Sequence, residues 1–268
     1  MLSPLFESLI HNNMSLIADE PDDDTAMVLK EADIFTDAEE SEEPKFKLDL
    51  NDKDLILEEL EDLMGYARIG KVKVLQLDKN YMGDAGVNIL AQSPCLFKLA
   101  SLSLGYNKIT DQGAMILAES PHWKRLRTLY LQWNTIGPEG IKALADSETL
   151  AGVEILYLKG NPLGPRGAEA LSQAGGMKNL KELYLAKTRL GVDGLEALCQ
   201  GDVLTNVTLL SLAYNRLDDD AAEILAGCKA LSNLKTLDMY GSHLSEDAKA
   251  MIKASPHLQQ LSALQVDW

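Results

Sequence analysis

Histidine and cysteine side chains are the first candidates for catalysis or metal binding, because both residue types ligate transition metals and can transfer protons. The chain has four histidines and three cysteines. His122, His257 and Cys95 each follow a Ser-Pro pair, and the two histidines lie five lengths of a 27-residue repeat apart. With one strand of a parallel sheet in each repeat, spaced about 4.8 Å apart, these histidines would be over 20 Å apart. They are too distant to share a metal ion or a proton.

Other motifs for chemistry are also missing from the sequence. It contains no G-x-x-x-x-G-K-[ST] phosphate loop and no C-x-x-C pair. The acidic run Asp218–Asp220 is better explained as a helix cap and first turn, where the helix dipole favours carboxylates, than as a calcium site. We therefore expect no enzymatic activity, no cofactor and no metal ion.

The three cysteines, Cys95, Cys199 and Cys228, are odd in number and occupy different positions in their repeats. They are interpreted as free thiols, which agrees with a reducing compartment. The N-terminus has no basic segment ahead of an apolar stretch, and no run of 18 or more apolar residues occurs, so neither a secretory signal nor a membrane span is expected. A cytoplasmic location follows as the expectation.

Aromatic residues form the most suggestive pattern. Tyr130, Tyr157 and Tyr184 are separated by 27 residues, and so are Tyr106 and Trp133. On adjacent strands the three tyrosines would form a ladder on an open face, flanked by the other aromatic residues. Tyrosine and tryptophan dominate interface hot spots, although tyrosines also suit strands for structural reasons. The predicted protein-binding residues, which we call the concave aromatic face, are Tyr106, Tyr130, Trp133, Tyr157, Tyr184, Tyr214 and Tyr240.

Four basic residues lie around this predicted face: Arg127, Lys159, Lys181 and Lys187. They would suit a partner with acidic groups. They would equally suit the acidic N-terminal part of this chain, so an intramolecular, autoinhibitory contact is a further hypothesis.

These residues are positioned by a repeat without gaps or insertions. A leucine recurs every 27 residues from Leu75 to Leu264, and a second apolar residue follows two positions later. The alternation predicts a short strand with one buried face. In the second half of each repeat, apolar residues with helical spacing, such as Leu144, predict a helix. A fixed period of this length is typical of a solenoid.

An asparagine ends most of the predicted strands, as at Asn134. Its side chain both donates and accepts hydrogen bonds, so when buried it can pair the turning backbone. Thr188 and Ser242 replace it in two repeats. Because their hydroxyls have less hydrogen-bonding capacity, we expect weaker turns there.

The pattern L-x-x-L-x-L-x-x-N-x-[IL]-G-x-x-G-x-x-x-L resembles the leucine-rich repeat, and its long helical half is similar to the ribonuclease-inhibitor subtype. The resemblance covers residues 72–268. It implies an α/β solenoid shaped as a horseshoe, with a parallel β-sheet on the concave face and helices on the convex face. The family is mostly a binding scaffold for unrelated partners.

The net charge of −16 lies entirely in residues 1–62, and the remainder is neutral. Between Asp19 and Glu43 there are 12 acidic residues against the single Lys30. This composition predicts a disordered acidic N-terminal arm over residues 1–45. The apolar stretch Leu2–Ile17 within it could bind a partner or fold back onto the repeats. Residues 46–71 are expected to form an N-terminal cap, and residues 72–268 seven repeats plus a terminal strand.

The function predicted from these features is a non-enzymatic scaffold or adaptor with a protein partner. Nucleic-acid binding is not expected, because the repeats are neutral and the acidic arm would repel phosphates. Two alternatives stay open. One is a regulator of an enzyme, either a GTPase activator or an inhibitor, and the other is an exported bacterial effector that uses the arm for secretion.

Overall fold

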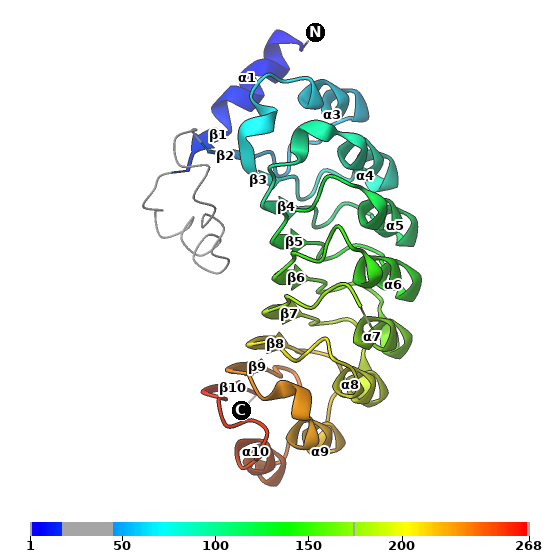
Figure 1. Cartoon of the computed structure of the whole chain (residues 1–268), viewed down its shortest axis with the longest axis vertical. Coiled ribbons are helices and arrows are strands. Elements are labelled where there is room, and N and C mark those ends of the chain that lie inside the picture. The colour runs from blue at the N-terminus through cyan, green and yellow to red at the C-terminus, as the bar shows by residue number, and fades with distance from the viewer. Residues whose placement is uncertain (1, 18–44, 174, 267–268) are drawn as a thin grey trace.

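The computed structural model describes residues 2–17, 45–173 and 175–266. Strands line one side of an elongated, curved solenoid, and helices stack along the outer side (Figure 1). The strands form one ten-stranded sheet in the order of the chain. They are β1 (Met14–Leu16), β2 (Phe46–Asp49), β3 (Val72–Gln76), β4 (Ser101–Ser103), β5 (Thr128–Tyr130), β6 (Ile155–Tyr157), β7 (Glu182–Tyr184), β8 (Leu209–Ser211), β9 (Thr236–Asp238) and β10 (Ala263–Gln265).

Helices follow the strands on the outer side. The α-helices are α1 (Pro4–Asn12), α3 (Leu57–Met64), α4 (Gly83–Gln92), α5 (Asp111–Glu119), α6 (Pro138–Asp146), α7 (Gly164–Ser172), α8 (Gly191–Gln200), α9 (Asp219–Gly227) and α10 (Glu246–Lys253). Short 3₁₀ turns are η1 (Ile69–Lys71), η2 (Pro94–Leu96) and η3 (Lys229–Leu231). In the part of the chain that the structure describes, no helix is long and apolar enough to cross a membrane.

The repeat length fixes the register of the sheet. From β2 to β10 every neighbouring pair is parallel, and Leu129 faces Leu102 on one side and Leu156 on the other. These leucines, and the helix leucines such as Leu144, are buried in a core that runs the length of the solenoid. The predicted α/β leucine-rich-repeat solenoid is confirmed, with a parallel sheet facing inward and helices outside.

Buried asparagines connect the repeats where the strands end. The Asn134 amide group donates to the carbonyl oxygens of Leu104 and Leu131, both at 2.9 Å. Its Oδ1 accepts from the backbone N–H groups of Asn107 at 2.9 Å and Ile109 at 3.0 Å. One side chain therefore pairs backbone groups of two successive repeats, which buried turns require.

The two substituted positions make fewer such bonds. Thr188 Oγ1 donates to the Leu185 carbonyl at 2.7 Å, but among the described residues this hydroxyl accepts no bond from the turn of the preceding repeat. Ser242 Oγ is buried and has no hydrogen-bond partner among the described residues. The hydrogen bonds thus agree with the expectation of weaker turns at both sites.

The N-terminal residues differ from their prediction. Residues 2–17 were expected to belong to a disordered arm, and this was wrong, since they form α1 and β1. Ser3 caps α1 by accepting from the Phe6 N–H, and Phe6 and Ile10 are buried in the core. β1 pairs antiparallel with β2. The helix lies at the N-terminal end of the solenoid (Figure 1). Its buried residues Phe6 and Ile10 belong to the hydrophobic core, so its apolar face covers the first layer.

The remainder of the predicted arm, residues 18–44, lies outside the described residues, and so does its proposed contact with the repeats. The segment predicted as a cap contains β2, which pairs in parallel with β3, and α3, whose Leu60 and Leu63 are buried. Leu48 lies one 27-residue period before Leu75, and the two residues face each other in the sheet.

Candidate protein-binding face

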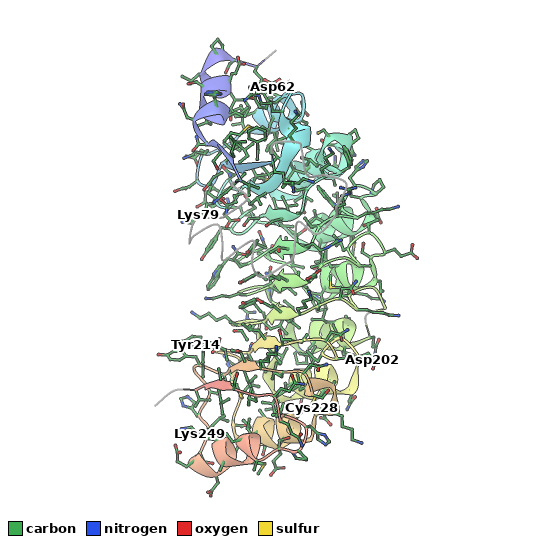
Figure 2. All side chains as sticks on the ribbon, turned by 60° about the vertical axis from the view of Figure 1, so that its left-hand side comes forward. Asp62, Lys79, Asp202, Tyr214, Cys228 and Lys249 are labelled. Carbon is green, nitrogen blue, oxygen red and sulfur yellow. The ribbon has the colours of Figure 1, made fainter. Side chains whose placement is uncertain are left out.

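The predicted binding residues come from β5, β6 and β7 and from the turns that follow the strands. Figure 2 shows Lys79 and Tyr214 on the strand side of the solenoid and Asp202 on the opposite, helical side. The residues of the concave aromatic face fall into two groups, one at a shared register position of the sheet and one in the turns after the strands. We call Tyr130, Tyr157 and Tyr184 the tyrosine ladder, and we call the residues of the adjacent turns, with Lys187 included, the turn row: Tyr106, Trp133, Lys187, Tyr214 and Tyr240.

The tyrosine ladder is closely stacked. The ring centroids of Tyr130 and Tyr157 are 4.5 Å apart, and those of Tyr157 and Tyr184 are 3.8 Å apart with an interplanar angle of 8°. All three side chains are half-buried. The parallel register explains the stack, since it places these residues opposite one another. The ladder therefore contributes to the sheet as well as to its surface.

Glu182 anchors one end of the ladder. The Tyr184 hydroxyl donates to Glu182 Oε2 at 2.8 Å. Burial raises the pKa of Glu182, and this hydrogen bond opposes the increase. Burial also raises the pKa of Tyr184, reinforced by hydrogen bonds with Tyr157 and Glu182. The phenol is thus kept protonated, as a hydrogen-bond donor.

The turn row is more exposed than the ladder. Tyr106 stacks on Trp133 at 5.8 Å, and Tyr214 meets Tyr240 edge-on at 5.4 Å. Between these pairs, Lys187 Nζ lies 5.6 Å from the Trp133 centroid and 4.7 Å from that of Tyr214. Trp133 is 36% exposed and Tyr214 48% exposed. Ring–ring and cation–π contacts therefore hold exposed aromatic surface in fixed positions.

The backbone of the turn row is strained at four of its five residues. Tyr106, Trp133 and Tyr214 each have φ of 57°, and Lys187 has φ of 56°. Bulky residues in this left-handed region are uncommon because their Cβ crowds the backbone. The same repeat position carries glycine in two other repeats, at Gly160 with φ of 78° and at Gly241 with φ of 76°. The chain thus has large side chains at positions where glycine would adopt the positive φ with less conformational strain.

The two glycines make room for the rings. A Cβ on Gly160 would lie 2.6 Å from the Trp133 ring, and one on Gly241 would lie 2.5 Å from the Tyr214 ring. Each ring therefore rests on the backbone of the next repeat. The sequence signal for this packing is the mixture of glycine and aromatic residues at one repeat position.

Gly160→Ala should lower the free energy of unfolding by about 2 kcal/mol, because alanine is strained at positive φ and its methyl group displaces Trp133. Urea denaturation would measure the change. Gly227→Ala is the matched control, since its Cβ would meet nothing within 4 Å at the end of α9 and alanine favours the helix. Equal effects of the two substitutions would contradict this packing of Trp133.

Two features of this side were missed from the sequence. Tyr81, in the turn after β3, is 56% exposed, and Lys108 Nζ lies 4.9 Å from its ring centroid. Its position directly after Asn80 in a turn was the available signal. The second feature is a polar cluster around Asp78, which no repeated pattern predicts.

Asp78 is a half-buried carboxylate near the N-terminal end of the sheet. It accepts hydrogen bonds from Ser103 Oγ, from the Gly105 N–H at 2.7 Å and from Gln132 Nε2 at 3.2 Å. Burial raises the pKa of Asp78, and its bonds to Ser103 and Gly105 oppose the increase. The Oε1 atoms of Gln132 and Gln76 are buried without a partner among the described residues. This cluster joins the turns of β3, β4 and β5.

The four basic residues predicted around the face divide into two pairs. Arg127 and Lys181 both contact Glu154, with Nε–Oε1 at 3.7 Å and Nζ–Oε2 at 2.6 Å. Both cations thus share one carboxylate, which balances only one of their two positive charges. Lys159 and Lys187 are exposed and form no ion pair with any carboxylate of residues 2–17, 45–173 and 175–266.

The histidines and cysteines are not assembled into a site. His122 and His257 lie before β5 and β10, five strand positions apart. Cys95, Cys199 and Cys228 are free thiols. Within the described ranges, no three His, Cys, Asp or Glu side chains are grouped so that they could hold a metal ion.

Four segments of the chain match a family model described as Leucine Rich repeat: residues 96–118, 125–145, 153–172 and 176–199. These four segments are leucine-rich repeats. The match does not distinguish subtypes, so the ribonuclease-inhibitor-like subtype stays a prediction. A search of curated proteins gives no match.

Several solved structures are similar to this chain. One is a TLR13–ssRNA13 complex, with 18% identity over 80% of this chain and 30% of that chain and a TM-score of 0.45. Another is the Rad7–Elc1 complex in yeast, with 15% identity over 78% and 65% and a TM-score of 0.43. A third is a TDR receptor, with 16% identity over 72% and 30% and a TM-score of 0.40. This chain thus spans between 30% and 65% of the length of these structures.

Proposed function

We propose that this protein is a non-enzymatic scaffold that binds a protein partner on its concave aromatic face. The leucine-rich repeats support a role in protein interaction. The observation that carries the proposal is the strained backbone of the turn row, where Tyr106, Trp133 and Tyr214 occupy positions that glycine fills elsewhere. Strain that stability does not require is characteristic of functional residues.

The geometry also suits binding energetically. Rings that are already stacked lose little side-chain entropy when a partner covers them. The turn row is exposed, and the tyrosine ladder beside it provides a rigid support. A large, preorganised aromatic surface is typical of interface hot spots.

The other expectations from the sequence are compatible with this proposal. A regulator that inhibits or activates an enzyme would use the same face, and an exported effector could carry it too. We also propose a cytoplasmic location and a division into residues 46–71 as a cap and residues 72–268 as repeats. Identification of a bound partner, followed by assays of its activity with and without this protein, would separate a scaffold from a regulator.

The test is a pull-down from lysate with the full chain and a variant in which Tyr106, Trp133 and Tyr214 are all glycine. Glycine removes the rings and also relaxes the positive-φ positions, so the variant should remain folded, as circular dichroism would check. The matched control is Phe97→Ala, because Phe97 is 48% exposed beside η2 and outside the face.

We expect wild type and Phe97→Ala to recover the same partner and the triple-glycine variant to lose it. Equal recovery by all three proteins would move the binding site elsewhere. A second variant, with alanine in place of Tyr130, Tyr157 and Tyr184, would show whether the tyrosine ladder contacts the partner directly.

A further inference from the structure

We propose that the C-terminal half of this face binds a short acidic segment of the partner in an extended conformation. The inference rests on the proposed function and adds the chemistry of the partner. The binding residues, which we call the basic patch, are Lys159, Lys187, Arg189 and Arg216.

The basic patch comes from three successive turns. Lys159 follows β6, Lys187 and Arg189 follow β7, and Arg216 follows β8. All four side chains are exposed. Lys187, Arg189 and Arg216 have φ of 56°, 60° and 59°, so the left-handed turns present them on the surface. Neighbouring strands are about 4.8 Å apart, so the three turns extend over about 10 Å.

The basic patch has no counter-ions in the described part of the chain. No carboxylate there forms an ion pair with any of its four members. Two carboxylates on the strands of this region bond to hydroxyl groups instead, since Glu182 accepts from Tyr184 and Asp238 accepts from Ser211 Oγ at 2.6 Å. Glu154 is paired with Arg127 and Lys181. Four exposed cations without an ion pair among the described residues fit a ligand of opposite charge.

Lys187 is the most preorganised member of the basic patch for binding a carboxylate. Its ammonium group lies between the rings of Trp133 and Tyr214, which restrict the side chain without neutralising it. A carboxylate that approaches therefore meets a charge with little freedom left to lose, and aromatic surface lies directly beside it.

The length of the patch limits the length of the ligand. An extended peptide advances about 3.3 Å per residue, so about 10 Å corresponds to roughly three or four residues. The opposite end of the face carries the carboxylates of Asp49 and Asp78. A short acidic motif fits this distribution better than a nucleic acid, whose phosphates would continue toward those carboxylates.

The experiment measures fluorescence anisotropy with the full chain at low salt. The probe is a fluorescein-labelled peptide with a run of glutamates between glycine and serine residues, and the control peptide has glutamine in place of glutamate. We expect saturable binding of the glutamate peptide only. Equal binding of both peptides would overturn the proposal.

The test variant combines Arg189→Glu with Arg216→Glu. The matched control combines Lys229→Glu with Lys253→Glu, which changes the net charge equally on exposed residues of η3 and α10. Each exposed ion pair contributes modestly to the binding free energy, so reversing two charges should raise Kd by about tenfold or more. The control should change Kd by less than about twofold. Equal effects of the two variants would exclude the basic patch. Lys187→Gln, which keeps a long side chain, should also weaken binding.

Two further outcomes are informative. A single-stranded oligonucleotide that binds more tightly, with the same dependence on Arg189 and Arg216, would overturn the peptide proposal in favour of nucleic acid. Binding of the glutamate peptide only after residues 18–44 are replaced by a neutral linker would assign the patch to this chain's own acidic segment. Loss of partner recovery in the triple-glycine variant without any effect of charge reversal would preserve the proposed function and refute this inference alone.

Discussion

Replacing Asn134 with alanine should lower the free energy of unfolding by about 3–4 kcal/mol. The substitution leaves the N–H groups of Asn107 and Ile109 and the carbonyl of Leu104 without another bond among the described residues. The Leu131 carbonyl keeps its bond from Asn161 at 2.8 Å. Leaving a buried polar group without a hydrogen bond costs about 1–3 kcal/mol, and three groups are affected. Water that enters the turn lowers this cost, which gives the expected loss.

Urea denaturation, followed by circular dichroism, would measure this effect. The reverse substitution provides the comparison, because Ser242→Asn adds the missing donors and acceptor at a buried hydroxyl that has no described partner, and it should raise the unfolding free energy by about 1 kcal/mol. A loss below about 1 kcal/mol for Asn134→Ala would mean that water pairs the turn adequately.

Replacing Ile10 with alanine should lower the free energy of unfolding by about 2–4 kcal/mol. Ile10 is fully buried, and α1 lies at the N-terminal end of the solenoid (Figure 1). Backbone bonds tie the segment after α1 to β2, since the Asp49 N–H donates to the Asn13 carbonyl at 3.0 Å. A cavity in this layer weakens the cover of the first repeat.

Because each repeat contacts mainly its neighbours, the loss should be strongest at the N-terminal end. Hydrogen exchange would show faster exchange at the amides of β2 and β3 and little change at β8 and β9. Leu5→Ala is the control on the same helix, because Leu5 is 85% exposed, and its effect should stay within about 0.5 kcal/mol. Comparable effects at Leu5 and Ile10 would refute the role of α1 as a cap.

The aromatic residues show how far the repeat pattern alone could predict the site. The 27-residue spacing places Tyr130, Tyr157 and Tyr184 opposite one another, and their rings stack. The spacing does not predict that Lys187 lies between Trp133 and Tyr214, or that Arg127 and Lys181 share Glu154. These contacts depend on side-chain directions, which repeat position does not fix.

The sequence by itself determined the solenoid, its register and the asparagine turns. One local pattern, repeated without insertion, specifies the contact between each repeat and the next, so Leu129 must meet Leu102 and Leu156. Only the tertiary structure decided the N-terminal helix α1, the strained conformation of Trp133 and the unpaired state of Lys187 among the described residues. Each of these occurs once or in a few repeats, and each depends on groups brought together by folding rather than on periodic spacing.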